Sequence, residues 1–461
     1  MGKSDRSGAR TVFVCQQCGK ESLKWLGRCP NCQQWNSFAE TAKTTPAPSI
    51  KAFSSFNPPL ELSQIAAETT DRLPLLPAEF NRVLGGGLVA GSLVLIGGEP
   101  GIGKSTLLLQ VAALHAQSRG RVVYVAAEET QHQIKLRAER LGVEGDDLYL
   151  LAETDLDIIL NQFEGLSPAL IIIDSIQAVS LPELEGTTGS IAQVRECTQR
   201  LMHWAKSGAV PILVSGHVTK DGAIAGPKVL EHIVDVVLYL EGEPFSAYRL
   251  LRGVKNRFGS TNEIGVFEMK SQGLIEVANP SQVFLAQRGG EAIGSAVVPV
   301  LEGSRPMLVE IQALTNFTSF GLPRRTVNGA DFNRLLLITA VLTRRLGLKL
   351  GNQDIIVNVA GGLRIGEPAA DLGIALAIAS SFRDVGIDPQ LVVVGEVGLS
   401  GELRAVAHLD RRVNEAVRLG FKRCLTPWTG TAGIPAPGGI ELIPVSTLRE
   451  AIGVGLLSSS K

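Results

Sequence analysis

A glycine-rich run that ends in a lysine and a serine carries the most specific chemistry in this sequence. Its residues are Gly98, Glu99, Pro100, Gly101, Ile102, Gly103, Lys104, Ser105 and Thr106. Residues 98–105 fill every fixed place of the Gly-x4-Gly-Lys-Ser/Thr phosphate loop, in which backbone N–H groups close around phosphate oxygens. Lys104 would add charge at the β- and γ-phosphates and Ser105 would ligate Mg²⁺. We expect residues 98–106 to bind ATP, and the alternative of a glycine-rich surface turn is disfavoured by the flanking apolar and helical patterns.

A second polar group follows the apolar run at 170–173. Asp174 ends this run, and together they have the Walker B pattern, in which a carboxylate holds Mg²⁺ through water while the strand excludes solvent. A lone aspartate at a strand end could instead cap a helix. Because a phosphate loop lies upstream, we expect Asp174 and Ser105 to share one Mg²⁺.

Hydrolysis also needs a group that orients or deprotonates the attacking water. The apolar run at 122–125 leads into Ala126, Ala127, Glu128 and Glu129. The strand register favours Glu128 as the catalytic carboxylate. The alternative, in which Glu129 has this role, stays open, although Glu129 is more typical of a solvated acid at a helix start.

Two cations lie in the pentad Lys255-Asn256-Arg257-Phe258-Gly259. On an extended segment, side chains at i and i+2 point the same way. Lys255 and Arg257 could therefore both reach the γ-phosphate of ATP bound to a neighbouring subunit. Taken alone, the pentad would favour a basic turn in solvent.

Four of the six cysteines lie within residues 15–32, at Cys15, Cys18, Cys29 and Cys32. Two Cys-x2-Cys knuckles of this kind bring four thiolates around one Zn²⁺. A pair of disulfides is the alternative, which a reducing cytosol disfavours. Cys197 and Cys424 stand alone in the sequence and are expected to be buried free thiols.

Alternating strands and helices must position the nucleotide-binding residues. Apolar runs at 93–96, 122–126, 148–151, 170–174, 211–215 and 234–240 are separated by helical patterns. This alternation predicts an α/β fold with a mostly parallel sheet, whose ligands lie at the carboxyl ends of the strands. A second alternating block begins near residue 286, with helices expected at 331–346, 369–382 and 409–419 and strands at 355–360 and 391–394.

Length and composition limit the number of domains and the class of protein that this chain can be. A chain of 461 residues predicts two or three domains, and its 45% hydrophobic and 19% charged residues are typical of a globular protein. No apolar run approaches the ~18 residues of a membrane span, and the N-terminus lacks a signal-peptide core, so we expect a cytoplasmic protein without membrane partners. The net charge of −1 means that any nucleic-acid surface must be a local patch.

The order of four-cysteine ribbon, phosphate loop, Walker B, Lys-Asn-Arg-Phe-Gly pentad and terminal block closely resembles the RadA (Sms) family of bacterial DNA-recombination ATPases. The resemblance covers essentially the whole chain. It implies a zinc ribbon at 1–40, a linker at 41–69, a RecA-like ATPase core at 70–275 and a Lon-protease-like domain at 286–461. It also implies a homohexamer around single-stranded DNA that drives branch migration of branched intermediates beside a RecA-type recombinase, and it makes Lys255 and Arg257 groups that act in trans.

By the same resemblance, His217 would sense the γ-phosphate, and Lys220 and Lys228 would contact DNA phosphates, which makes binding dependent on salt. Flexible surface loops with a capping histidine are the alternative for this region. A DNA-independent RecA-like scaffold and an ATP-dependent protease remain alternative functions for the chain.

The terminal block resembles the proteolytic domain of Lon, which uses a serine nucleophile and a lysine base. Ala369 stands where the serine belongs, and Asp410 stands where the lysine belongs. Without a hydroxyl and an amine there is no acyl-transfer nucleophile, so we expect a protease fold without protease activity. Basic residues such as Arg334 and Arg412 could line a DNA surface there, although each is individually more typical of a solvated face or a salt bridge.

Overall fold

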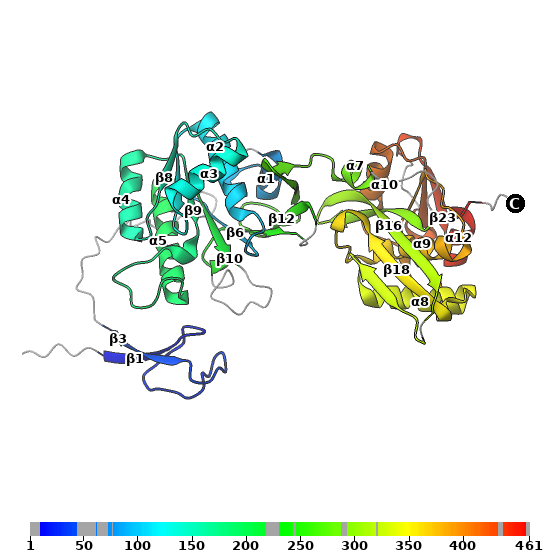
Figure 1. Cartoon of the computed structure of the whole chain (residues 1–461), viewed down its shortest axis with the longest axis horizontal. Coiled ribbons are helices and arrows are strands. Elements are labelled where there is room, and N and C mark those ends of the chain that lie inside the picture. The colour runs from blue at the N-terminus through cyan, green and yellow to red at the C-terminus, as the bar shows by residue number, and fades with distance from the viewer. Residues whose placement is uncertain are drawn as a thin grey trace, which may run out of the picture. The chain divides into compact units, whose positions relative to one another are not determined.

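A computed structural model describes residues 10–43, 61, 72–75, 77–217, 230–242, 246–286, 293–319, 321–431 and 437–457. The chain forms two compact units, and it passes between them more than once (Figure 1). The first unit contains Met1–Glu241, Arg252–Thr261 and Ser271–Leu274. The second contains Gly242–Leu251, Asn262–Lys270 and Ile275–Lys461. Because of this interleaving, the boundaries expected at 70–275 and 286–461 stay predictions.

The N-terminal segment is a small antiparallel sheet in the order β2-β1-β3. Its strands are β1 (Arg10–Cys15), β2 (Glu21–Ser22) and β3 (Phe38–Lys43). Its buried residues are few, namely Cys15, Cys29 and Phe38, with Phe13, Cys18 and Cys32 packed against them. So small a core cannot hold a fold by apolar burial alone, which leaves stabilisation to the cysteines.

The largest sheet has nine strands in the order β14-β13-β12-β11-β6-β10-β9-β7-β8. The strands are β6 (Leu93–Gly98), β7 (Val122–Ala126), β8 (Leu148–Leu151), β9 (Leu170–Asp174), β10 (Ile212–His217), β11 (Val236–Glu241), β12 (Tyr248–Asn256), β13 (Ile264–Lys270) and β14 (Gly273–Glu276). The run from β11 to β8 is parallel throughout. The predicted parallel sheet is therefore confirmed, each of its expected strands lying within two residues of its predicted bounds.

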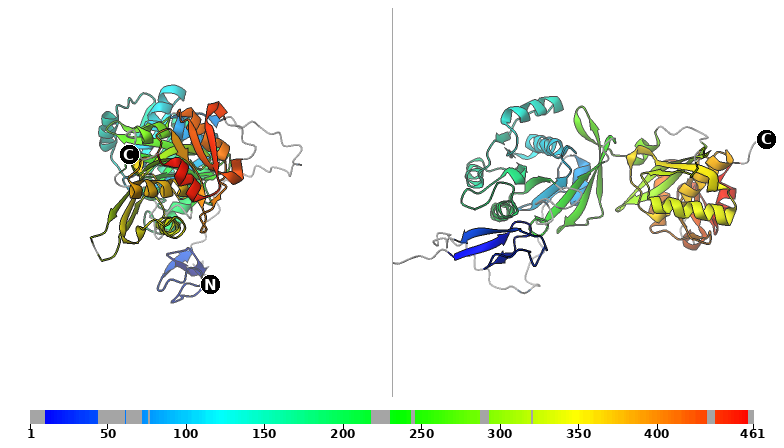
Figure 2. Two further views of the ribbon diagram at one scale, coloured as in Figure 1. Left: turned by 90° about the vertical axis from the view of Figure 1, so that its right-hand side faces the viewer. Right: turned by 60° about the horizontal axis from the view of Figure 1, so that its bottom comes forward.

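Helices cover this sheet on both faces, which is why its central strands are mainly apolar. The helices are α1 (Ala78–Leu84), α2 (Lys104–Arg119), α3 (Gln131–Leu141), α4 (Leu156–Leu166) and α5 (Ile191–Gly208), and a short hairpin of β4 (Arg72–Leu73) and β5 (Leu88–Val89) lies nearby in the chain. One apolar cluster joins Ile159 and Phe163 of α4 and Leu201 of α5 to alternate strand residues. Helix α2 contacts β6, β7, β9 and β10. Figure 2 shows the helices stacked beside the strands.

The second unit has a seven-stranded mixed sheet in the order β17-β18-β16-β15-β19-β22-β23. Its strands are β15 (Ser295–Glu302), β16 (Arg305–Phe317), β17 (Arg325–Asn328), β18 (Gln353–Val359), β19 (Leu391–Val393), β22 (Arg423–Pro427) and β23 (Glu441–Val445). Its helices are α7 (Pro280–Leu285), α8 (Phe332–Leu346), α9 (Asp371–Arg383), α10 (Leu409–Arg418), α11 (Trp428–Thr431) and α12 (Leu448–Gly455), with a small pair of strands, β20 (Glu396–Val397) and β21 (Leu403–Arg404).

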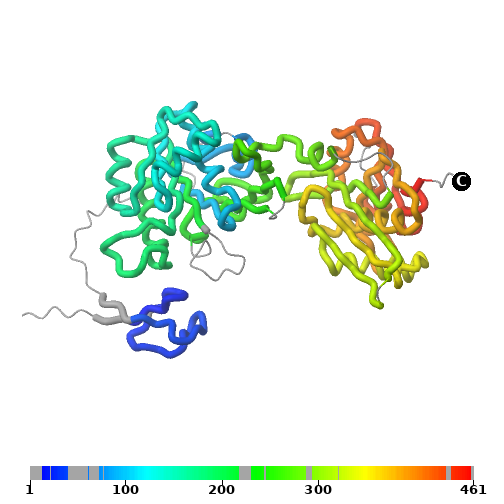
Figure 3. Tube along the Cα trace, in the orientation of Figure 1, coloured from blue at the N-terminus to red at the C-terminus, as the bar shows by residue number. Residues whose placement is uncertain are grey.

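The predicted helices and strands of this unit are confirmed to within two residues at nearly every end. The main addition is the antiparallel hairpin of β15 and β16, which fills the middle of the sheet. β15 pairs with β19 and β16 pairs with β18, so the sheet continues on both sides of the hairpin. Figure 3 shows the Cα trace of the chain. The α/β fold class is thus established for both units.

Among the described residues, the search for a helix with the length and apolarity of a bilayer span found none.

Candidate nucleotide and zinc sites

The phosphate loop connects the end of β6 to the first residue of α2. Glycine is required where the loop begins, because a Cβ built at Gly98 would lie 2.6 Å from the Leu240 carbonyl oxygen of β11. Gly101 and Gly103 have φ values of 76° and 115°, which L side chains rarely adopt. The loop therefore turns sharply and delivers the first N–H groups of α2 to a phosphate.

Lys104 is buried at the start of α2 and folds back over the loop. Its Nζ donates to the carbonyl oxygens of Gly98 at 2.9 Å and Glu99 at 3.0 Å. Burial lowers the pKa of this ammonium group, and the negative charges of Asp174 and Glu128 oppose that shift. The structure thus brings together the lysine and the two carboxylates that the sequence predicted separately.

Asp174 ends β9, which lies between β7 and β10 in the sheet. Its two carboxylate oxygens accept hydrogen bonds from opposite sides. The Tyr124 hydroxyl donates to Oδ2 at 2.6 Å, and the Ser215 hydroxyl donates to Oδ1 at 2.5 Å. Each carboxylate oxygen keeps a further lone pair, so this group still fits a hydrated Mg²⁺.

The two neighbouring glutamates have different partners. Glu128 accepts a hydrogen bond from the hydroxyl of Ser175, the residue after Asp174. Glu129 instead forms an ion pair with Arg137 of α3, with 2.5 Å between Oε1 and Nη2. The geometry therefore directs Glu128 toward the Walker B strand and ties Glu129 to a helix, which favours the predicted role of Glu128.

Lys255 and Arg257 of the basic pentad are anchored to residues 231–235. Lys255 Nζ donates to the carbonyl oxygens of Glu231 at 2.5 Å and Val234 at 2.8 Å. Arg257 Nη1 lies 3.0 Å from Oδ1 of the buried Asp235, yet 47% of the arginine side chain stays exposed. The pentad is therefore an anchored feature rather than a freely solvated turn.

The predicted DNA contacts are only partly described. His217 is the last residue of β10 and pairs in register with Gly98 of the phosphate loop strand. Lys220 and Lys228 lie outside the described residues. All three DNA assignments stay predictions.

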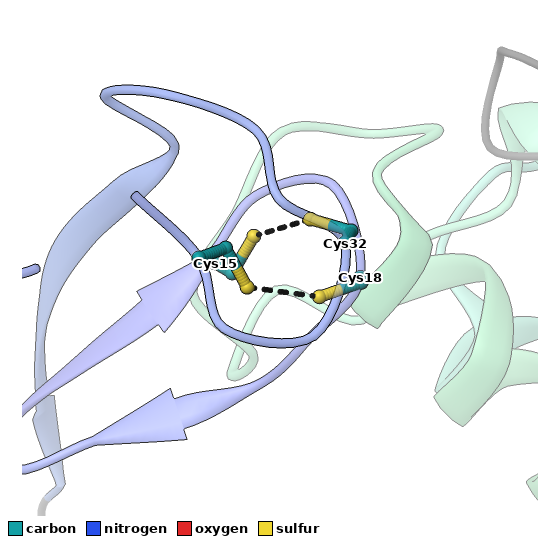
Figure 4. A group of neighbouring side chains, drawn as sticks. Cys15, Cys18 and Cys32 are labelled. Carbon is teal, nitrogen blue, oxygen red and sulfur yellow. Dashed lines mark hydrogen bonds between the residues drawn. The ribbon is translucent and has the colours of Figure 1, made fainter. Parts of the chain in front are cut away.

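The four clustered cysteines form a metal site. Their Sγ atoms all lie within 4.8 Å of one another, and the Cys15–Cys32 and Cys18–Cys29 sulfur pairs are each 3.5 Å apart (Figure 4). A tetrahedral Zn²⁺ with Zn–S bonds of about 2.3 Å places its sulfurs about 3.8 Å apart, whereas a disulfide joins them at about 2.05 Å. All four are free thiols, so the zinc prediction fits and the disulfide alternative does not.

Hydrogen bonding prepares part of this site for a cation. Burial raises the pKa of the Cys15 thiol, but hydrogen bonds with the Ser37 side chain and with the backbone of Gln17 and Cys18 outweigh it and lower the pKa to about 6. The thiolate is the form that binds zinc. Cys197 and Cys424 are buried free thiols, as predicted, and burial raises the pKa of each to about 12.

Ion pairs occupy the terminal segments that resemble a serine–lysine protease. Ala369 is buried, and Asp410 is exposed in the first turn of α10. Arg412, two residues further along that helix, is 2% exposed and donates to both carboxylate oxygens of Glu367, at 2.8 and 2.5 Å. Arg334 likewise pairs with the buried Asp371.

These contacts decide between two interpretations of the terminal arginines. Arg412 is a buried salt-bridge partner of Glu367, so its assignment to an open basic surface is wrong, whereas Arg334 pairs with the buried Asp371 and keeps 27% of its side chain exposed. Arg412 also donates to the Pro299 carbonyl oxygen at 2.6 Å, so its charge is satisfied within the unit.

Sequence reasoning did not find Tyr124, Ser175 and Ser215 as members of the nucleotide site. Each donates to one of the two predicted carboxylates. A polar residue inside an otherwise aliphatic strand is the one signal that could have pointed to Tyr124 and Ser215.

Three protein families match successive parts of the chain. The AAA domain family matches residues 57–223, the rubredoxin metal binding domain family matches 13–40, and the family of subunit ChlI of Mg-chelatase matches 309–429. Among solved structures, a KaiC-like protein from Pyrococcus horikoshii OT3 aligns with a TM-score of 0.38 at 20% identity, covering 45% of this chain and 99% of its own.

Curated relatives cover nearly the whole chain. The DNA repair protein RadA of Halalkalibacterium halodurans is 53% identical over 97% of this chain and 99% of its own length. The proteins of the same name from Bacillus subtilis and Listeria monocytogenes are each 50% identical, over 97% and 98% of this chain and 99% of theirs. The chain therefore belongs to the RadA family of DNA repair proteins, as an ATPase that uses ATP with Mg²⁺ and carries a Zn²⁺-binding ribbon.

Proposed function

We propose that this protein is a DNA-stimulated, helicase-like ATPase that promotes branch migration during strand exchange by a RecA-type recombinase. In this proposal it works in the cytoplasm as a homohexamer around single-stranded DNA and processes branched recombination intermediates. The names of its full-length relatives support the DNA repair role. The site residues support the ATPase that powers it.

The proposed roles in hydrolysis follow from the contacts in the first unit. The amides of residues 98–106 bind the phosphates, and Lys104 leaves its carbonyl partners to neutralise phosphate charge. Ser105 and Asp174 hold Mg²⁺, which when bound neutralises charge on the phosphates. Glu128, fixed by Ser175, orients and deprotonates the attacking water.

The observation that carries the motor proposal is the way in which Arg257 is held. Its backbone N–H donates to the Asp235 carbonyl oxygen at 3.1 Å, and its guanidinium contacts the Asp235 carboxylate, which also accepts from the Leu93 N–H at 3.2 Å. The backbone and one guanidinium nitrogen of Arg257 are thus linked through Asp235 to the central strand β6, while 47% of the arginine side chain is exposed. Such an anchored cation suits a group that completes the ATP site of a neighbouring subunit.

The DNA contacts proposed for this motor are His217, Lys220 and Lys228, and the ring is proposed to place them toward the single strand. Binding should then weaken as salt rises, because lysine contacts to phosphates release counterions. A Lys228→Ala variant should bind single-stranded DNA less tightly and with a shallower salt dependence.

The decisive experiment is steady-state ATP hydrolysis with and without single-stranded DNA. We expect DNA to stimulate the native protein, Lys104→Ala to be inactive, and Arg257→Ala to bind nucleotide but lose DNA-stimulated turnover. Arg252→Ala is the matched control, because Arg252 lies on β12, the strand that leads into Arg257, and pairs with Glu241. Turnover that ignores DNA, or an Arg257→Ala variant with native turnover, would contradict the motor proposal.

A second assay separates the motor from a simple ATPase. Joint molecules made by a RecA-type recombinase should be extended faster when the native protein and ATP are added. Lys104→Ala should not extend them.

A further inference from the structure

Tyr124 places a hydroxyl inside the apolar centre of the first unit. Its side chain is 0% exposed, and its neighbours in β7 are the aliphatic Val122, Val123, Val125 and Ala126. A buried hydroxyl is costly unless it is hydrogen-bonded, and phenylalanine would fill nearly the same space without that cost. The cost of burying this hydroxyl is offset by its hydrogen bond to Oδ2 of Asp174, at 2.6 Å.

Ser215 supplies a matching contact from the other side. It is 1% exposed, lies on β10 and donates to Oδ1 of Asp174 at 2.5 Å. Because β9 lies between β7 and β10, each neighbouring strand fixes one oxygen of the same carboxylate. Two donors on opposite oxygens restrict rotation of the carboxylate plane and leave one lone pair on each oxygen for a ligand.

The direction of the Tyr124 hydrogen bond is settled by the chemistry around it. An ionised carboxylate has no proton to donate, whereas a phenol has one. The phenol stays protonated and can only donate to the carboxylate. Ser215, which contacts Asp174, is paired in the sheet with Ile96 of β6, the strand that ends at Gly98 of the phosphate loop, so this carboxylate belongs to the phosphate end of the site.

We infer that Tyr124, together with Ser215, is a positioning residue that orients the Asp174 carboxylate for Mg²⁺ bound with ATP. The inference rests on the role proposed above for Asp174. Groups that orient a metal-binding carboxylate typically contribute about 10- to 100-fold to metal affinity. Tyr124 and Ser215 need not touch the nucleotide to have this effect.

The test measures how strongly Mg²⁺ strengthens the binding of a fluorescent non-hydrolysable ATP analogue. In Tyr124→Phe, we expect the Mg²⁺ concentration for half-maximal enhancement to rise about tenfold. Binding of the analogue without Mg²⁺ should match the native protein. Ser215→Ala should shift the Mg²⁺ dependence in the same direction, and Mn²⁺ binding followed by electron paramagnetic resonance should show the same loss.

Tyr149→Phe is the matched control. Tyr149 lies on β8 of the same sheet, is 39% exposed, and should leave the Mg²⁺ dependence unchanged. Circular dichroism and thermal melting establish that each variant is folded. If Tyr124→Phe does not fold, Ser215→Ala carries the test.

Two results would overturn the inference. One is a native Mg²⁺ dependence in folded Tyr124→Phe and Ser215→Ala. The other is an equal loss of nucleotide binding with and without Mg²⁺, which would indicate a packing role. Asp174→Asn separates these failures from failure of the proposed function: if it keeps the native Mg²⁺ dependence, the role of Asp174 itself is wrong.

Discussion

The nucleotide site of the first unit and the protease-like segments of the second unit treat their carboxylates in opposite ways. Asp174 and Glu128 are held by the neutral hydroxyls of Tyr124, Ser215 and Ser175, so their negative charge remains available to a cation and to water. Glu367 and Asp371 are instead paired with arginines. Neutral donors orient a charge without cancelling it, whereas a guanidinium cancels it.

This difference concerns the segments of the second unit that resemble a serine–lysine protease. Where a protease would need a nucleophile and a base, the second unit has a buried methyl group and an exposed carboxylate. The Arg412–Glu367 pair joins the two segments that would have carried them. At these positions the charges are paired within the unit, whereas Asp174 and Glu128 in the first unit contact neutral hydroxyls.

The largest expected effects come from two aspartate substitutions, one of which should lower activity and the other stability. Asp174→Asn should lower ATP hydrolysis about 10²- to 10³-fold, because it removes charge aimed at the reacting phosphates, while the melting temperature stays near native. Asp371→Asn should instead destabilise the second unit by about 3 kcal/mol, because Arg334 loses its carboxylate. Hydrolysis rates and denaturant unfolding of both variants test this contrast. A destabilised but active Asp174→Asn together with a stable but inactive Asp371→Asn would refute it.

The Arg412–Glu367 pair should show strong energetic coupling. Arg412→Met alone should cost about 3 kcal/mol, because Glu367 would keep a charge in a largely enclosed place. Adding Glu367→Gln should recover much of that loss, since no unpaired charge then remains. Unfolding free energies of the two single variants and the double variant give the coupling, and simply additive losses would mean that the pair does not act as a unit.

The smallest expected effect concerns protease activity, for which we expect no change. Ala369→Ser combined with Asp410→Lys restores the two residue types that the protease chemistry needs, but Asp410 is exposed and the Arg412–Glu367 pair still links the two segments. We expect no cleavage of fluorescent casein, with or without ATP. Cleavage above the background of the native protein would show that the second unit is closer to a working protease than its ion pairs indicate.

Motifs formed by neighbours in the chain were predictable. The phosphate loop, the Walker B aspartate and the two cysteine knuckles each depend on spacing within a few residues, and the structure places them as the sequence suggested. The central strands were predictable for a similar reason, because a strand buried on both faces is a continuous apolar run. The hairpin of β15 and β16 was not predicted, although residues 296–301 are also a largely apolar run, followed by Gly303 and Ser304.

What the sequence determined by itself was the type of chemistry: which residues can bind phosphate, which carboxylate can bind a cation, and which thiols can bind zinc. Tertiary structure alone decided which partners hold those groups. Tyr124 meets Asp174 across 50 residues of sequence, Ser215 meets it across 41, and Arg412 meets Glu367 across 45. The physical reason is that a hydrogen bond or ion pair between strands and helices depends on their order and register, which are set by packing of the whole unit rather than by local spacing.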